Sequence, residues 1–401
     1  MGIAEEIDAV LDEVIELRRD LHAHPEIAYQ EERTASRVHE CLENIPGIEI
    51  RSGLAKTGLV ATLRGDLEGP AVALRADMDA LPMEDACGKP WASKIPGMAH
   101  TCGHDGHTAA LVGAARVLGA RQDKLSQPVK FVFQPAEEGG AGADKMIQDG
   151  VLEAPEVAAI FGLHGWPTLD RGQIGVCLGP MLASSTAIEI EVSGKGGHAA
   201  MPHLTHDPVV AAAQLITALQ TLVSRTLNPL QSGVVSICKL DGGTAFNVIP
   251  DRVKLLGTVR ALSQETRDFL FHKIRQVSEQ ISGAFDCTAT LTIHEGYPVT
   301  VNAESAFNVF EKSAREVVKE GELIVRVKPS MGGEDFSFYA QKIPSNFWFL
   351  GVRPVGAQNQ AQLHQPKYEF PDDMLEPAIR LHCATAFGFA KYQNPESAPN
   401  H

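Results

Sequence analysis

The sequence is short of positive charge: its 401 residues carry 35 Lys and Arg against 50 Asp and Glu, a formal net charge of −15. Affinity for nucleic acids depends chiefly on basic side chains that neutralise phosphates, so this deficit argues against a nucleic-acid partner. The same deficit disfavours binding to an anionic membrane surface. Long apolar runs are also missing, since no stretch reaches the roughly 18 residues that a membrane-spanning helix needs. We therefore expect a soluble protein.

Paired cysteines are lacking as well. The seven cysteines are odd in number, widely spaced and without a CxxC motif, which argues against a disulfide framework and favours free thiols. The start of the chain is acidic and has neither the basic nor the apolar segment of a signal peptide. These features together predict a cytoplasmic location.

Both ends of the sequence show strand-like apolar runs that alternate with helical patterns. We expect strands at 59–63, 71–76, 129–133, 157–163 and 347–352, and helices at 3–21, 34–42, 108–118, 303–319 and 374–392. This alternation is typical of an α/β fold, in which helices flank a mixed, mostly parallel sheet.

The middle of the chain follows a different pattern, strand, helix, two strands, helix, strand. Asp207 followed by Pro208 predicts the start of the first helix, and Ser263 can cap the second. This order is that of a ferredoxin-like α+β domain. At this length two domains are expected, so we predict a discontinuous first domain of 1–182 and 296–401, interrupted by an inserted second domain at 183–295.

Candidate metal ligands cluster just before the expected helix at 108–118. The segment from His100 to His107 holds three imidazoles, one thiol and one carboxylate among glycines. Imidazole and thiolate are preferred ligands of ions such as Zn²⁺, and the glycines allow the backbone to direct several side chains to one point. The segment therefore predicts a metal site.

Two further polar groups follow expected strands. Glu137 and Glu138 come directly after the strand that ends at Phe133, and His164 is expected to end the next one. Open α/β sheets bind ligands outside the carboxyl ends of their strands, so these side chains should gather near the cluster. The sequence has no GxSxG, GxGxxG, GxxxxGK[ST] or HExxH motif, which argues against other hydrolases and nucleotide-binding proteins. A hydrolytic metal site remains the best interpretation.

Several motifs, in order along nearly the whole chain, resemble those of the aminoacylase and carboxypeptidase family of dinuclear metallohydrolases. The similarity is greatest to its amidohydrolase branch, with hippurate hydrolase, N-acyl-amino-acid amidohydrolases and auxin-conjugate hydrolases. The motifs are His22-Ala23-His24-Pro25-Glu26, Asp77 to Pro82, His100 to His107, Gln134 to Gly139, Gly162-Leu163-His164, Gly196 to Ala200, Gly243 to Pro250, Met331 to Phe336 and Leu363-His364.

The resemblance implies two divalent ions per chain, which could be zinc, manganese, cobalt or nickel, and Glu137 as the catalytic base. The ligands that it implies are Cys102, His104, Glu138, His164 and His364. Two divalent ions less one thiolate, one carboxylate and one hydroxide leave a charge of about +1, which suits an anionic substrate.

The resemblance also implies roles outside the ligand set. Asp79 would orient a metal ligand, and His198 would donate a hydrogen bond to the carbonyl oxygen of the scissile amide. Asn247 and Arg260 are candidates for binding the substrate's carboxylate. The inserted domain would serve as the lid and would make a homodimer or higher homo-oligomer.

One position departs from the wider family. Other branches have His-x-Asp where this chain has Asp77-Met78-Asp79, so Asp77 cannot supply an imidazole ligand, and its role stays open. His107, His203 and Glu334 are interpreted as structural or as support for the ligands.

The sequence thus predicts a metal-dependent amidohydrolase that uses a metal-activated water to cleave the amide of N-acyl or N-aroyl amino acids, as hippurate hydrolase does. A dipeptidase, a carboxypeptidase or a deacetylase of the N-acetyl-diaminopimelate type is the alternative on the same centre. A protein that binds such conjugates without catalysis is a more distant alternative.

Overall fold

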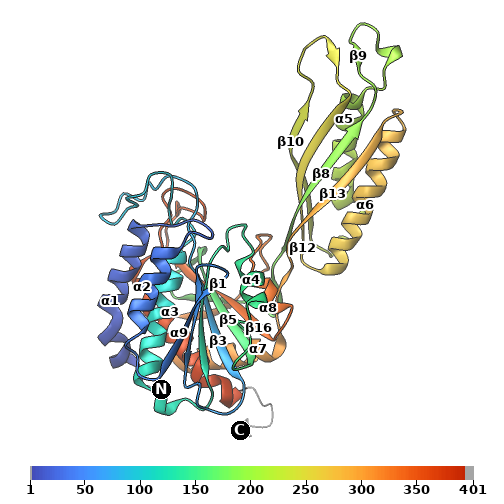
Figure 1. Ribbon diagram of the computed structural model, residues 1–401. Helices are drawn as coiled ribbons and strands as arrows, with labels where there is room; N and C mark the ends of the chain where they lie inside the picture. Colours follow the sequence, from blue (N-terminus) through green and yellow to red (C-terminus); the bar gives the residue numbers. More distant parts are fainter. Residues whose placement is uncertain (1, 393–401) are drawn as a thin grey trace. The chain divides into compact units, whose positions relative to one another are not determined.

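The computed structural model describes residues 2–392, and they form two compact units (Figure 1). Of the described residues, unit 1 comprises 2–179, 301–328 and 335–392, and unit 2 comprises 180–300 and 329–334. Unit 2 is therefore inserted into the sequence of unit 1, and a second short segment of unit 2 precedes Asp335.

Unit 1 is built on an eight-stranded sheet with the order β1-β2-β4-β3-β5-β16-β6-β15. The pairs β3–β4, β3–β5, β5–β16 and β6–β15 are parallel, and the pairs β1–β2, β2–β4 and β6–β16 are antiparallel. The strands are β1 (Ile48–Leu54), β2 (Gly58–Leu63), β3 (Ala71–Asp77), β4 (Val129–Gln134), β5 (Val157–Asp170), β6 (Gln173–Val176), β15 (Leu323–Arg326) and β16 (Ser345–Arg353).

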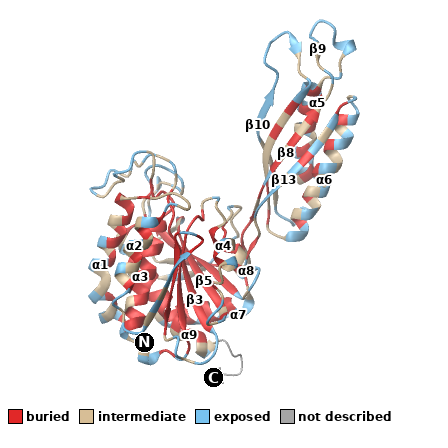
Figure 2. Cartoon of the chain, viewed as in Figure 1, coloured by how far each residue is buried: buried red, intermediate tan, exposed pale blue. Residues whose placement is uncertain are grey.

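Helices cover this sheet, so its central strands are buried on both faces. Every residue of β3 and β4 is buried, and Figure 2 shows the same for the middle of the sheet. The helices of this unit are α1 (Ala4–Ala23), α2 (Glu32–Leu42), α3 (His104–Ala120), α4 (Gly142–Gln148), α7 (Glu304–Val317), α8 (Ser337–Ala340) and α9 (Leu375–Tyr392). The predicted α/β fold is confirmed, because two apolar faces per strand can be buried only between helical layers.

Unit 2 has a four-stranded antiparallel sheet with the order β10-β12-β8-β13. Its elements are β8 (Ser184–Ser193), α5 (Pro208–Thr221), β10 (Gly233–Gly242), β12 (Arg252–Ala261), α6 (Gln264–Gly283) and β13 (Thr288–Tyr297). Asp207 and Ser263 cap α5 and α6 with side-chain hydrogen bonds, as predicted. The strand order and the two helices are those of the ferredoxin-like arrangement.

Within the described part of the chain, no helix combines the length and the apolar character needed to cross a membrane. All seven cysteines are free thiols.

Candidate metal centre

The carboxyl ends of β3 and β4 and the first turn of α3 bring the predicted ligands of unit 1 together. Strand β3 ends at Asp77, β4 ends at Gln134 just before Glu137, and α3 begins at His104. The helix starts four residues earlier than predicted, inside the histidine cluster. Gly103 permits this start, because it has a left-handed φ of 96° and a Cβ there would approach the Tyr368 hydroxyl to 3.1 Å.

All five predicted ligands lie close together. Cys102 Sγ is 3.3 Å from His164 Nε2, and His364 Nε2 is 3.0 Å from Glu138 Oε1. Cys102, His104 and His164 form one group of donor atoms within 4.8 Å of one another, and Cys102, Glu138 and His364 form another. The backbone N–H of His364 donates to Thr101 O at 2.9 Å, which ties this distant loop to Cys102.

The position of His164 corrects one expectation. Strand β5 does not end there but continues to Asp170, because β16 pairs with it from Phe349, opposite His164, as far as Arg353, opposite Asp170. On the other side, the pairing with β3 stops at Gly162. His164 therefore lies where β5 extends beyond its neighbour β3, which leaves its side chain close to the cluster.

Hydrogen bonds orient the two buried imidazoles of the ligand group. His104 Nδ1 bonds to Asp79 O at 2.8 Å, and His164 Nδ1 bonds to Gly165 O at 2.8 Å. Because a carbonyl oxygen only accepts, each Nδ1 carries a proton, and Nε2 is the ring nitrogen left to bind a ligand. This is the arrangement that metal-binding histidines usually have.

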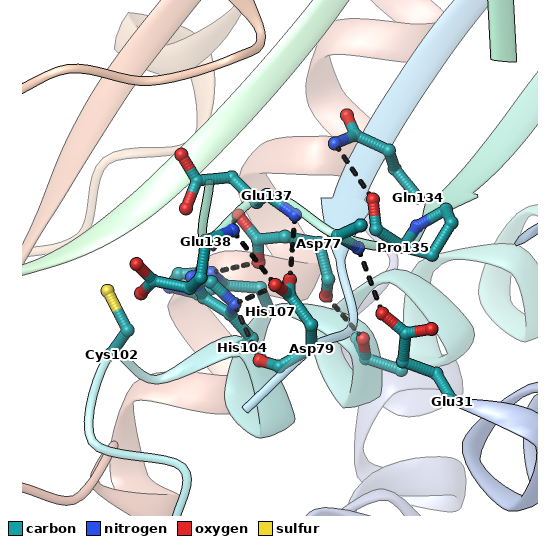
Figure 3. Close-up of polar contacts among 12 residues, drawn as sticks. Glu31, Asp77, Asp79, Cys102, His104, His107, Gln134, Pro135, Glu137 and Glu138 are labelled. Atoms are coloured by element: carbon teal, nitrogen blue, oxygen red, sulfur yellow. Dashed lines mark hydrogen bonds and ion pairs between the residues drawn. The ribbon is translucent and has the colours of Figure 1, made fainter. Parts of the chain in front are cut away.

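Asp79 holds both glutamates in place (Figure 3). Its carboxylate accepts hydrogen bonds from the backbone N–H groups of Glu137 at 3.0 Å and Glu138 at 2.8 Å. The two side chains then diverge, and Glu138 points toward Cys102. Glu137 is 6% exposed, and one of its oxygens accepts from the backbone N–H of Asp335 at 3.4 Å. One carboxylate therefore belongs to the ligand group, while its neighbour keeps a separate direction.

A buried polar network beneath the ligands was not predicted. Arg75 donates to Asp77 at 2.7 Å, to Gln134 at 2.8 Å and to Asp335 at 3.0 Å. Gln134 in turn donates to both carboxylate oxygens of Asp335 at 2.8 Å. Sequence offered one signal, since Asp335 lies in the motif Met331 to Phe336, but nothing in the sequence pairs it with Arg75.

His107 belongs to this network rather than to the ligands. Its Nδ1 donates to Asp77 at 2.7 Å, and its Nε2 accepts from the backbone N–H of Gly165 at 2.9 Å. Both ring nitrogens are thus in use. Asp77, whose role was open, lies between His107 and Arg75 and anchors the start of α3.

Burial and charge shift the pKa values in the cluster strongly. Burial and the charge of Glu138 raise the pKa of the Cys102 thiol well above its usual range. Burial opposes protonation of His104, but the charges of Asp77 and Asp79 outweigh it and raise its pKa to about 10. Burial lowers the pKa of His164 well below its usual range. A buried thiol surrounded by carboxylates can ionise readily only beside added positive charge.

These observations fit a pair of divalent ions. His104 Nε2 is fully buried and has no hydrogen-bond partner. Asp77 and Asp335 pair with Arg75, and the nearby carboxylates of Asp79, Glu137 and Glu138 add further negative charge to the cluster. One thiolate, one carboxylate and three imidazoles are ligands typical of zinc and related ions. The donor set therefore suits cations in both charge and chemistry.

The three remaining candidates lie in unit 2. His198 in β9 (Gly197–His198) is exposed and pairs with Val248 in β11 (Val248–Ile249), and the backbone N–H of Ala199 donates to Asn247 O at 3.1 Å. His198 and Asn247 are thus neighbours at one end of the unit, where Figure 1 shows β9. Arg260 lies near the opposite end of β12, about 26 Å from Arg252 on a strand that rises about 3.3 Å per residue.

An α/β sheet with thiol, imidazole and carboxylate donors gathered at its carboxyl edge is the arrangement expected of a metal-dependent hydrolase. Comparison with known proteins gives the family. Residues 73–387 match Peptidase family M20/M25/M40, and the chain belongs to this family.

Relatives and solved structures agree with this assignment. The chain is 44% identical to N-acetyl-L-cysteine deacetylase of Bacillus subtilis (strain 168), over 85% of this chain and 80% of that protein. It is 43% identical to IAA-amino acid hydrolase ILR1-like 4 of Arabidopsis thaliana, over 94% of this chain and 85% of that one. The crystal structure of the Bacillus subtilis YXEP protein, a dinuclear metal-binding peptidase of the M20 family, superposes with a TM-score of 0.83 at 36% identity, covering 95% of this chain and 98% of that one. The protein is thus a hydrolase that acts on amide bonds.

Proposed function

We propose that this protein is a metal-dependent amidohydrolase that cleaves the amide bond of N-acyl or N-aroyl amino acids, releasing a carboxylic acid and a free amino acid. The observation that carries the proposal is the convergence of five candidate metal-ligand side chains beside a buried carboxylate, Glu137, whose side chain diverges from that of Glu138. Relatives named as a deacetylase of an N-acetyl amino acid and as a hydrolase of an auxin conjugate support this substrate class.

Cys102, His104, Glu138, His164 and His364 would hold two divalent ions, of zinc, manganese, cobalt or nickel. Such ions would supply Lewis acidity and would lower the pKa of water to about 7. Glu137 takes a proton from the attacking water and returns it to the leaving amine, a role that contributes roughly 10²- to 10⁴-fold. Asp79 keeps Glu137 and Glu138 at fixed positions by binding both backbone N–H groups.

His198 is suited to donate a hydrogen bond to the amide carbonyl oxygen. The backbone N–H of Ala200 donates to its Nδ1 at 3.1 Å, so the proton of the neutral ring lies on the exposed Nε2. Arg260 is suited to bind the substrate's carboxylate, because it is half-buried and its buried Nη1 has no hydrogen-bond partner.

The separation of Asn247 from Arg260 supports a homodimer. One small carboxylate cannot reach both side chains of a single copy, so binding by both requires a second copy. Phe246 and Val248, which flank Asn247, are 101% and 51% exposed, and such apolar side chains are favourable in an interface. We place the protein in the cytoplasm, where its seven free thiols stay reduced.

A dipeptidase, a carboxypeptidase or a deacetylase of the N-acetyl-diaminopimelate type would use the same ligand set and would differ in what lines the substrate site. A panel of acetyl-, benzoyl-, indoleacetyl- and peptidyl-amino acids, each assayed with zinc, manganese, cobalt and nickel, separates these activities. We expect the acyl and aroyl amino acids to be hydrolysed fastest. Preference for the peptides would favour the alternative, and full activity of the chelated protein would refute both.

The metal ligands have their own test. Cys102→Ser should reduce the metal content, measured by elemental analysis, while Cys238→Ser, which changes an exposed thiol, should not. An unchanged content of two ions per chain in Cys102→Ser would remove Cys102 from the ligand set.

A further inference from the structure

A second group of donor side chains lies elsewhere in unit 1. His22 is on α1, and Asp85 and Cys87 are in the loop that follows β3. Their donor atoms all lie within 4.8 Å of one another. None of the three belongs to the ligand set described above. We propose that His22, Asp85 and Cys87 bind a single Zn²⁺ ion at a site separate from the proposed dinuclear centre.

The distances in this group match those between ligands of one tetrahedral ion. His22 Nε2 is 3.3 Å from Asp85 Oδ2 and 3.8 Å from Cys87 Sγ. Nitrogen and oxygen ligands about 2.0 Å from zinc and a sulfur ligand about 2.3 Å away lie roughly 3.3 to 3.6 Å from one another. Zinc can therefore be held with only small shifts of the three side chains.

The imidazole of His22 is already oriented for such a role. Its Nδ1 lies 2.8 Å from Asp105 Oδ2, so Nε2 faces Asp85 and Cys87. A carboxylate on the far nitrogen of a metal-binding histidine fixes the ring and makes it a better ligand. Asp105 is itself fixed, because Arg18 Nη1 lies 3.5 Å from it and both side chains are buried.

The surroundings of His22 favour positive charge. Its side chain is 1% exposed and lies between the carboxylates of Asp85 and Asp105. Burial opposes protonation of the ring, but Asp105 and Asp85 outweigh it and raise the pKa of His22 to about 11. When no ion is bound, a proton on the His22 ring offsets the negative charge of the Asp85 and Asp105 carboxylates. A divalent ion bound to Nε2 would offset the same charge.

Asp85 and Cys87 are held together independently of any ion. Asp85 accepts hydrogen bonds from the backbone N–H of Cys87 at 2.8 Å and from that of Ser93 at 2.7 Å. The loop that carries both donors is therefore shaped before binding, which reduces the entropy cost of assembling the site.

The site also has an entry path and an open coordination position. Cys87 lines a cavity of about 1130 Å³ whose walls belong to unit 1 and include Lys89, Gln365 and Glu369. Three protein ligands leave the fourth tetrahedral position for water or a small ligand from this cavity. The ion would link α1 to the loop after β3, two segments that are more than sixty residues apart in the chain.

Zinc stoichiometry tests this site directly and without reference to catalysis. The full chain is stripped with a chelator, loaded with Zn²⁺ and freed of excess metal by gel filtration. We expect Cys87→Ala to hold one zinc ion fewer per chain than the unmodified protein, and the matched control Cys238→Ala to hold the same number. Equal zinc in Cys87→Ala and the unmodified protein would overturn the proposal.

A second measurement needs no variant and so does not depend on the folding of one. Alkylation of each cysteine by iodoacetamide is followed by mass spectrometry with and without Zn²⁺. Zinc should slow alkylation of Cys87 at least tenfold and leave that of the exposed Cys238 unchanged. An equal rate at Cys87 would refute the site, and neither result depends on whether the protein hydrolyses acyl amino acids.

Discussion

The two units bury very different side chains. Unit 1 encloses charged and ionisable groups, and among those with no more than 1% exposure are Arg75, Asp77, Asp79, His104 and Asp335. In unit 2 the buried polar residues are mostly hydroxyl-bearing, such as Thr186, Ser278 and Ser282, and Glu334 is the charged one among those described. Burying a charged side chain is costly unless it is paired. The concentration of buried charged side chains in unit 1 therefore indicates that the chemistry takes place there.

The candidate residues of the two units differ in the same way. Hydrogen bonds orient the His104 and His164 rings and the backbone of Glu137 and Glu138 in unit 1, whereas His198, on the short strand β9, and Asn247, in the turn before β11, are exposed. The candidate metal ligands are thus preorganised within unit 1. The candidate substrate-binding residues His198 and Asn247 lie on an exposed surface of unit 2.

Replacing Glu137, the buried carboxylate of unit 1 beside the candidate ligands, should have the largest effect, and the effect should be on activity. Glu137→Gln keeps the shape of the side chain but cannot accept a proton. We expect activity to fall by about 10²- to 10⁴-fold while metal content stays unchanged. Initial rates and elemental analysis of the same preparations measure both. The exposed Glu156→Gln is the control and should be fully active. Comparable turnover in the two variants would remove Glu137 from its role.

The network beneath the ligands should dominate the stability of unit 1. Arg75→Met leaves Asp77 and Asp335 without their guanidinium, and removing one partner of a buried charge pair costs about 3 to 5 kcal/mol. Urea unfolding followed by circular dichroism should show the loss.

A matched arginine of unit 2 provides the comparison. Arg252→Met changes a side chain that is 73% exposed and pairs with Glu191 at 3.9 Å, and exposed pairs contribute about 0 to 1 kcal/mol. Similar losses of stability in Arg75→Met and Arg252→Met would contradict our argument that buried charged pairs contribute more to stability than exposed ones.

The same difference explains what could be predicted from the sequence. Unit 2 follows local rules, because side chains alternate along β8 and β12 and Asp207 and Ser263 start the helices. The predicted order of strand, helix, two strands, helix and strand is found in β8, α5, β10, β12, α6 and β13. The strand β1 was missed because its residues are largely exposed and it lacks an apolar run.

In unit 1 the side chains that could bind metal were predicted from the sequence, but the buried residues that hold them in place were not. A dense group of imidazoles and a thiol is unusual enough to predict metal binding from sequence. The pairing of Arg75 with Asp335 joins residues 260 positions apart, and no local pattern encodes it. The start of α3 at His104 was also missed, because Gly103 and the bond of His107 to Asp77 fix that turn through tertiary contacts.

The exposed histidine of unit 2 should affect catalysis rather than metal binding. We expect His198→Ala to lower kcat by about 100-fold, since one preorganised donor to a developing oxyanion contributes on the order of 3 kcal/mol. Metal content should not change. His294→Ala, which changes an exposed histidine on β13 of the same unit, is the control and should keep normal kcat. Loss of metal from His198→Ala with normal kcat after reloading would instead place His198 among the ligands.

The smallest effect on stability should come from replacing Asp207, the N-cap of α5, and the metal site of unit 1 should not be affected. Asp207 accepts hydrogen bonds from the backbone N–H groups of Val209 at 2.8 Å and Val210 at 3.4 Å. Asp207→Ala removes both and should lower stability by about 1 kcal/mol, whereas Asp207→Asn keeps an accepting oxygen and should lose much less. Thermal unfolding of the full chain compares them, and metal content should be equal in both. A loss of metal in Asp207→Ala would show that the two units do not respond separately.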